Sequence, residues 1–138
     1  MFTKMIVALD GSEQSIRAAE KAIGLAKMSG AYTYVVYVVD GTTSKADVLQ
    51  TWNSLGIASN RVKKFTQVES NAKKEGIPYE VKILRGDPAA KIISFSMEVD
   101  ADLIVIGSRG LNQFQQMILG SVSHKVVKRA ACAVLIIK

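Results

Sequence analysis

The chain has 138 residues, 49% of them hydrophobic and 22% charged, which suits one globular domain over residues 1–138 and excludes disordered and collagen-like classes. Its net charge of +6 comes from basic residues mixed with acidic ones along both halves, so we expect no nucleic-acid partner. With a single cysteine, a single histidine, no export signal and no apolar run long enough for a membrane span, we expect a cytoplasmic protein without a Cys/His zinc site.

The first part of the chain predicts a strand, a helix and a second strand. Lys4 to Leu9 is a mainly apolar run that ends in the turn Asp10-Gly11-Ser12. Ser12 is placed to cap a helix that Gly30 ends. Ala31 to Val39 is rich in Tyr and Val without alternation, as expected of a central strand that is buried on both faces of a parallel sheet. The boundaries of any element in residues 41–60 are not defined by the pattern.

The rest of the chain continues to alternate helices and strands. Residues 77–83 alternate apolar and polar side chains, which predicts a strand with one wetter face, and Pro78 restricts it to a sheet edge. Asp87 and Pro88 predict a helix start, because Asp caps helices and Pro fits their first position. The residues of this helix that are expected to face the sheet are Ile92, Ile93, Ser96 and Val99. The other predicted elements are a helix from Asn60 to Gly76, a strand from Leu103 to Ile106, a helix from Gly120 and a strand from Ala133 to Ile137.

Five strands alternating with four helical regions predict an α/β protein, a three-layer sandwich around a five-stranded, mainly parallel sheet. In such sheets ligands bind beyond the carboxyl ends of the strands, where the strand order reverses. A strand order of 3-2-1-4-5 would bring Asp10-Gly11-Ser12 beside Gly107-Ser108-Arg109-Gly110. The site is therefore expected where these two turns meet.

Two segments of the last third predict anion sites. Gly107 and Gly110 lack Cβ atoms, so their backbone can take positive φ and a phosphate can approach the N–H groups closely. Gly120-Ser121-Val122-Ser123 begins a helix whose free N–H groups and dipole attract an anion, with two hydroxyls placed to donate. Two anion sites suggest a polyphosphate.

Two charged residues add to this interpretation. Arg109 supplies a positive charge, and Asp10 is placed to contact a sugar hydroxyl or a Mg²⁺ ion that accompanies the phosphates. Each pattern alone also fits a tight turn or a helix cap. The combined spacing favours the nucleotide.

That spacing resembles the universal stress protein family. Gly107-x-x-Gly110, nine residues and then Gly120-Ser121 match the family pattern G-2x-G-9x-G-[S/T]. Further segments are similar to the same family, so that the resemblance covers the chain except for residues 41–60: Asp10-Gly11-Ser12, Val38-Val39-Asp40, Gly86-Asp87-Pro88 and Val134-Leu135-Ile136-Ile137.

The resemblance implies a Rossmann-like homodimer of the ATP-binding subtype, with ATP and Mg²⁺ as the expected cofactors. It implies that Val38 hydrogen-bonds adenine through its backbone and that Asp10 lies at the nucleoside. The residues around ribose and phosphates would be Gly107, Arg109, Gly110, Gly120, Ser121, Val122 and Ser123. No side chain is assigned to a metal, except Asp10 through Mg-ATP. The segment Leu111 to Leu119 is either a lid or packed on the body.

The last predicted strand is also expected to form an interface. If Ala133 to Ile137 lies at a sheet edge, this uncharged apolar run would promote aggregation unless a second chain paired with it. We therefore expect the strand to pair across a two-fold axis, as the resemblance also implies. The sequence does not identify a client protein.

Little in the sequence indicates catalysis. The Walker motif, the Ser-His-Asp elbow and the G-x-G-x-x-G fingerprint are absent, and no general base stands out. We expect a stress-response protein, a dimeric regulator or interaction module that depends on nucleotide binding. Two alternatives stay open: a slow ATP hydrolase or phosphotransferase, and a dimeric interaction module whose glycine loop is empty.

The other residues with chemical potential have simpler interpretations. Cys132 is expected to be a buried, inert thiol, because alanines flank it. His124 is assigned no role. Trp52 and the series Tyr32, Tyr34 and Tyr37 are expected in the core rather than stacked on a base.

Overall fold

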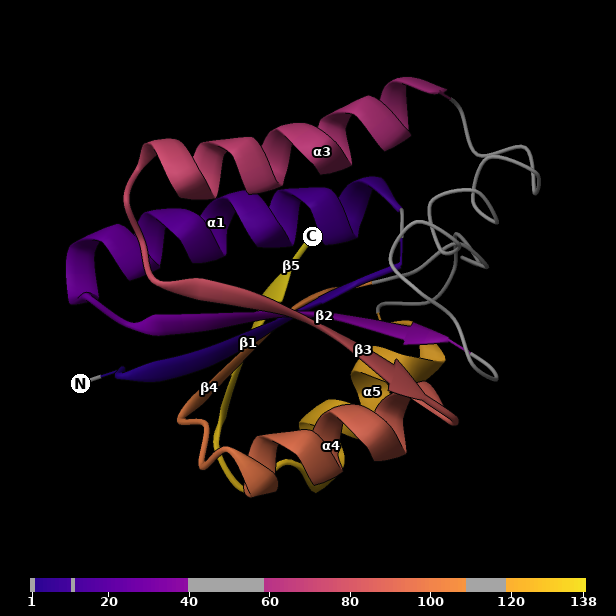
Figure 1. Ribbon diagram of the computed structural model, residues 1–138. Helices are drawn as coiled ribbons and strands as arrows, with labels where there is room; N and C mark the ends of the chain where they lie inside the picture. Colours follow the sequence, from indigo (N-terminus) through magenta and orange to yellow (C-terminus); the bar gives the residue numbers. More distant parts are fainter. Residues whose placement is uncertain (1, 11, 40–58, 109–118) are drawn as a thin grey trace.

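In the computed structural model, strands and helices alternate along the described residues, which are 2–10, 12–39, 59–108 and 119–138 (Figure 1). The elements of these ranges are β1 (Lys4–Leu9), α1 (Glu13–Ser29), β2 (Tyr32–Val39), α3 (Ser59–Lys74), β3 (Tyr79–Arg85), α4 (Pro88–Glu98), β4 (Leu103–Gly107), α5 (Ser121–Arg129) and β5 (Ala133–Ile137). None of the described helices is long and apolar enough to cross a membrane.

The sheet has the order β3-β2-β1-β4-β5, and each neighbouring pair of strands is parallel. Helices α1 and α3 cover one face of the sheet, and α4 and α5 cover the other (Figure 1). The α/β class and the strand order predicted from the sequence are therefore confirmed. The order reverses between β1 and β4, so a crevice is expected at their carboxyl ends.

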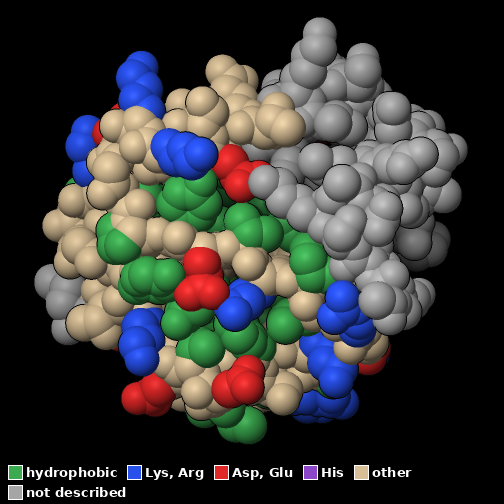
Figure 2. Space-filling model, in the orientation of Figure 1, with side chains coloured by type: hydrophobic (Ala, Val, Ile, Leu, Met, Phe, Trp, Pro, Cys, Tyr) green, Lys and Arg blue, Asp and Glu red, His purple; other side chains and the backbone are tan. Residues whose placement is uncertain are grey.

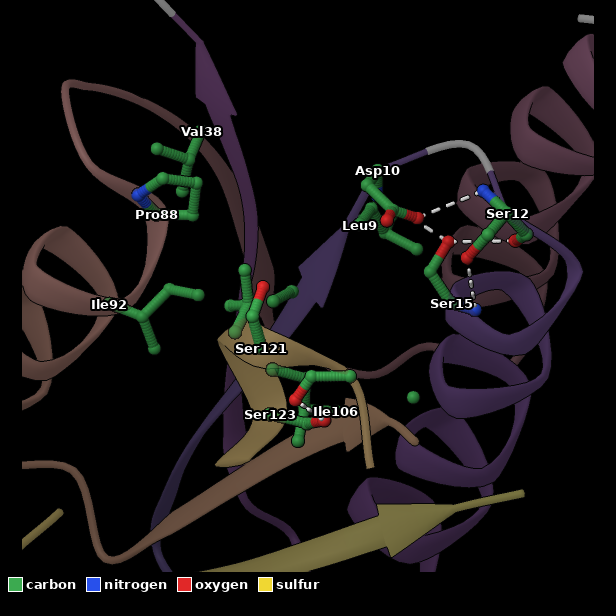
Figure 3. A pocket seen from close by; sticks show the side chains of 14 residues that line it. Leu9, Asp10, Ser12, Ser15, Val38, Pro88, Ile92, Ile106, Ser121 and Ser123 are labelled. Atoms are coloured by element: carbon green, nitrogen blue, oxygen red, sulfur yellow. Dashed lines mark hydrogen bonds between the residues drawn. The ribbon is translucent and has the colours of Figure 1, made fainter. Parts of the chain in front are cut away.

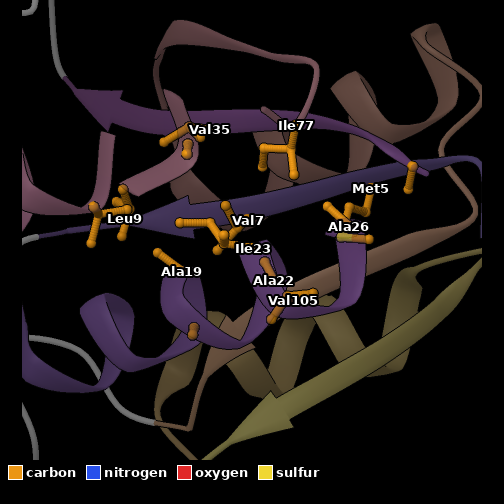
Figure 4. Close-up of a cluster of buried hydrophobic side chains, with 14 of the residues drawn as sticks. Met5, Val7, Leu9, Ala19, Ala22, Ile23, Ala26, Val35, Ile77 and Val105 are labelled. Atoms are coloured by element: carbon orange, nitrogen blue, oxygen red, sulfur yellow. The ribbon is translucent and has the colours of Figure 1, made fainter. Parts of the chain in front are cut away.

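The hydrophobic core divides between the two faces of the sheet because side chains alternate along each strand. On one face Met5 and Val7 of β1 pack with small residues of α1, among them Ala22 and Ala26 (Figure 4). On the other face Ile6 joins the cluster that α4 and α5 cover. The alanines bring α1 close to the sheet, and this close approach places the first turn of the helix beside the end of β4.

The predicted helix boundaries are confirmed at three positions. Ser12 caps α1, since its side chain accepts a hydrogen bond from the N–H of Ser15 at 3.1 Å. Gly30 ends that helix with a φ of 74°, in the left-handed region that glycine adopts readily. Asp87 caps α4 by accepting from the N–H of Ala90 at 3.0 Å.

Strand β3 lies at a sheet edge, as predicted, and the Lys82 and Glu80 side chains on its polar face are 44% and 39% exposed. Its residues are half-buried on both faces, except the exposed Arg85. The polar side chains find partners: the Tyr32 hydroxyl donates to Glu80 at 2.9 Å, and the Lys82 ammonium lies 3.0 Å from the same carboxylate. Figure 2 shows acidic and basic side chains among hydrophobic ones on the face that carries this edge. Such charges discourage pairing with another strand.

The prediction that the tyrosines lie in the core is confirmed for Tyr37 and, in part, for Tyr34, which packs against the core, whereas the half-buried Tyr32 belongs to neither core cluster. Tyr37 is buried, and Tyr34 meets Phe95 of α4 edge-on with ring centroids 5.2 Å apart. Phe95 was not among the residues expected to face the sheet, whereas Ile93 was; the structure buries Phe95 and leaves Ile93 half-buried. Trp52 lies outside the described residues.

Candidate functional site

A crevice of about 290 Å³ opens at the carboxyl ends of β1 and β4, where the strand order reverses (Figure 3). Seven of the nine residues that the sequence analysis assigned to the nucleotide line it: Asp10, Val38, Gly107, Gly120, Ser121, Val122 and Ser123. Arg109 and Gly110 lie outside the described residues, as does the segment 111–118. Of the two turns that were expected to meet, the described residues Asp10, Ser12 and Gly107 line the same crevice.

The crevice has an apolar side and a polar side. Val38 of β2 lies with Pro88 and Ile92 of α4 on one side, opposite Asp10 and Ser12 (Figure 3). Such a division suits a ligand with a flat apolar ring at one end and hydroxyl or charged groups at the other. Sequence reasoning assigned Pro88 only to a helix start and Ile92 only to the core. The position of α4 next to the end of β2 could have indicated their second role.

On the polar side, the turn after β1 holds Asp10 in a hydrogen-bonded loop. A carboxylate oxygen of Asp10 accepts from the N–H of Ser12 at 2.9 Å. The Ser15 hydroxyl donates to the carbonyl of Ser12 at 2.8 Å, and the Asp10 N–H donates to that hydroxyl at 3.4 Å. The first turn of α1 is therefore capped by Ser12, and these hydrogen bonds hold the half-buried Asp10 at the crevice wall.

The first turn of α5 is different. Its N-cap is Gly120, in an extended conformation with φ −70° and ψ 168°, and among the described residues no side chain caps this helix. By contrast, Ser12 and Asp87 cap α1 and α4. Because Ser121, Val122 and Ser123 line the crevice, the uncapped end faces it. Uncapped N–H groups and the positive end of the helix dipole make this a place for an anion.

Position 107 requires glycine for a structural reason that differs from the expected one. Its φ lies outside the left-handed region, so the positive φ suggested from the sequence is not used. A Cβ at this position would lie 2.8 Å from the Cβ of Gln14 and 3.0 Å from its backbone carbon. The missing side chain therefore allows the first turn of α1 to lie against the end of β4.

The remaining titratable candidates lie away from this crevice. His124 is exposed, and Cys132 is half-buried rather than fully buried as expected. Burial raises the pKa of the Cys132 thiol, which keeps it protonated at neutral pH. Among the described residues, His, Cys, Asp and Glu form no cluster of three or more that could hold a metal ion.

The chain is similar to known proteins over its whole length. The family model described as the universal stress protein family matches residues 1–138. Universal stress protein YxiE of Bacillus subtilis is 35% identical over 153 residues, with 100% of both chains covered. The universal stress protein from Archaeoglobus fulgidus in complex with dAMP is 28% identical, with a TM-score of 0.71 over 99% of this chain and 98% of that chain. A universal stress protein in complex with cAMP is 26% identical, with a TM-score of 0.71 over 99% and 96%.

Proposed function

This chain belongs to the universal stress protein family, and we propose that it acts as a stress-response protein that binds a nucleotide, ATP with Mg²⁺, in the crevice between β1, β4 and α5. The observation that carries the proposal is the uncapped first turn of α5, which faces a crevice with an apolar wall. The relatives in complex with dAMP and cAMP support it, because their ligands are nucleotides and their fold is the same.

The parts of the nucleotide match the parts of the crevice. Adenine lies on the apolar side, against Pro88 and Ile92, and hydrogen-bonds the backbone of Val38. Ribose lies near Asp10, whose carboxylate accepts from its hydroxyls. The phosphates take the N–H groups of Ser121 and its neighbours in the first turn of α5, each charge-assisted hydrogen bond being worth about 1.5 to 3 kcal/mol.

Two further groups complete the phosphate site in this proposal. Arg109 and Gly110 follow Ser108 directly in the sequence, so they are close to the crevice in chain distance. Mg²⁺, when bound with ATP, neutralises part of the phosphate charge, and Asp10 is the crevice carboxylate that would hold it. In this proposal, a nucleotide in the crevice changes how the protein binds a client protein. The protein is proposed to act in the cytoplasm.

Strand β5 provides the dimer contact in this proposal. It lies at a sheet edge, and its residues Val134 to Ile137 are half-buried in the single chain. Pairing two copies of β5 would satisfy the open backbone and cover these side chains. We expect light scattering to show a dimer at micromolar concentration, and Leu135→Lys to shift it towards monomer; a monomeric parent chain would contradict this part of the proposal.

The simplest test of nucleotide binding is to identify any nucleotide that co-purifies with the protein. Acid extraction of the purified protein, followed by chromatography, should release an adenine nucleotide, and isothermal titration should show binding of added ATP. Gly120→Val adds a side chain in the crevice at a φ of −70° that any residue adopts, so it should fold and lose the titration signal. If the variant binds ATP as well as the parent chain does, the site is elsewhere.

A further inference from the structure

The backbone of Ser108 connects two distant parts of the protein. Ser108 directly follows β4 and is 2% exposed. Its N–H donates to the carbonyl of Ile137 in β5 at 2.8 Å. Its carbonyl accepts from the N–H of Gly120 at 2.6 Å and from the hydroxyl of Ser123 at 2.8 Å. One residue therefore fixes the end of β5 and the first turn of α5 to the same point of the sheet.

The Ser123 hydroxyl is fully engaged within the protein. A serine hydroxyl has one proton to donate. Here the acceptors are the Ser108 carbonyl at 2.8 Å and the Gly120 carbonyl at 3.1 Å, and the residue is 2% exposed. The expectation from the sequence was that this hydroxyl donates to a phosphate. Of the two serines in the first turn of α5, only the exposed Ser121 keeps its hydroxyl for such a contact.

We propose that Ser123 is a positioning residue for the phosphate of the ligand, acting through the carbonyl of Ser108. This inference rests on the proposed function, since it concerns the same crevice. The bond across 15 residues holds the uncapped turn of α5 against the end of β4. Because the N–H of Ser108 is hydrogen-bonded to the carbonyl of Ile137, Ser108 is held in place and does not move with the first turn of α5. The N–H groups of the turn then stay aimed at one point in the crevice.

A pair of ligands separates positioning from general stability. AMP and adenosine share the base and the ribose, and only AMP carries a phosphate for the first turn of α5. Loss of the Ser123 hydroxyl should weaken AMP binding by about tenfold, the effect of one hydrogen bond, and leave adenosine binding within about twofold. Ser123→Thr keeps a hydroxyl and should restore AMP binding.

Ser96 provides the matched control. It is 4% exposed in α4, outside the crevice lining, and its hydroxyl donates to the carbonyl of Ile93, three residues back, at 2.6 Å. Ser123 makes the same kind of local bond to Gly120 in addition to the long-range one. Ser96→Ala therefore removes a buried local bond alone and should leave the dissociation constants of both ligands unchanged.

Isothermal titration of the parent chain, Ser123→Ala, Ser123→Thr and Ser96→Ala with both ligands decides the question. If the parent chain binds none of ATP, AMP and adenosine, the proposed function fails. If Ser123→Ala binds AMP as tightly as the parent chain, or weakens AMP and adenosine equally, the positioning role is overturned. Should Ser123→Ala not fold, amide NMR of the parent chain gives the second test. AMP should then shift the amide signals of Ser108 and of the first turn of α5, and equal shifts with adenosine would overturn the proposal.

Discussion

A single charge in the first turn of α5 should separate the stability of the helix from its ligand binding. Ser121 is the first residue of α5, it is exposed, and the first turn contains no acidic residue. Ser121→Glu places a carboxylate at the positive end of the helix dipole, which stabilises a helix by about 0.3 to 1 kcal/mol. The same carboxylate lies where the proposed phosphate binds, so the two effects have opposite signs.

The size of the binding effect follows from Coulomb's law. Two unit charges about 6 Å apart repel by about 3 kcal/mol at an effective dielectric constant of about 20. Screening at an exposed position reduces this to about 1 to 2 kcal/mol, so the dissociation constant for AMP should rise about five- to thirtyfold. The dissociation constant for ATP should rise at least as much, because the triphosphate places more negative charge near the new carboxylate.

Isothermal titration at low and high salt measures the effect on binding, and thermal unfolding measures the effect on stability. Ser121→Gln is the control, because it has nearly the same shape without the charge. The expected result for Ser121→Glu is a melting temperature that is unchanged or slightly higher, with weaker binding that recovers partly at high salt. If Ser121→Glu binds AMP as tightly as Ser121→Gln does, the first turn of α5 is not the phosphate site.

Three further predictions concern the fold that positions the crevice. Gly24 lies inside α1 with open space where a Cβ would lie, so Gly24→Ala should stabilise the protein by about 0.5 to 1 kcal/mol in urea unfolding, and a loss of stability would contradict the described packing. Gly107→Ala should destabilise it by about 1 to 3 kcal/mol, because the new Cβ would lie 2.8 Å from that of Gln14; an unchanged unfolding midpoint would show that this approach is not required. Burial acts to raise the pKa of Asp102, but hydrogen bonds from Thr3 outweigh it and hold that pKa below its ordinary value. The stabilisation is therefore present at neutral pH and lost as the pH falls through the lowered pKa, so Asp102→Asn should cost stability at pH 7 and differ less from the parent chain below about pH 4.

Most element boundaries could be predicted because local chemistry marks them strongly, whereas the strand order was inferred from the topology of alternating strands and helices. Asp10 and Ser12 close β1 and start α1, and Asp87 with Pro88 does the same for α4, so each boundary has its own chemical signal. Apolar runs such as Leu103 to Ile106 indicate strands that are buried on both faces. Because parallel strands align their carboxyl ends, these signals also placed the two turns together.

What the sequence missed depends on contacts between distant residues. Gly107 was correctly predicted to lie at the site. The requirement for glycine there comes from the close approach of Gln14, which depends on α1 lying against β4. The Ser123 hydroxyl was assigned to a ligand because its partner, the carbonyl of Ser108, is 15 residues away. Phe95 was not predicted to face the sheet, because the helical spacing from Ile92 was assigned to other residues of α4.

The central claim is that the first turn of α5 binds the phosphates of a nucleotide whose base lies against Val38 and α4. A crystal structure of the protein grown with ATP and Mg²⁺ tests it most directly. We predict phosphate oxygens within hydrogen-bond distance of the N–H groups of Ser121 and Val122, with adenine on the apolar side of the crevice. A nucleotide bound elsewhere, or a crevice that stays without one at saturating ATP, would contradict the account.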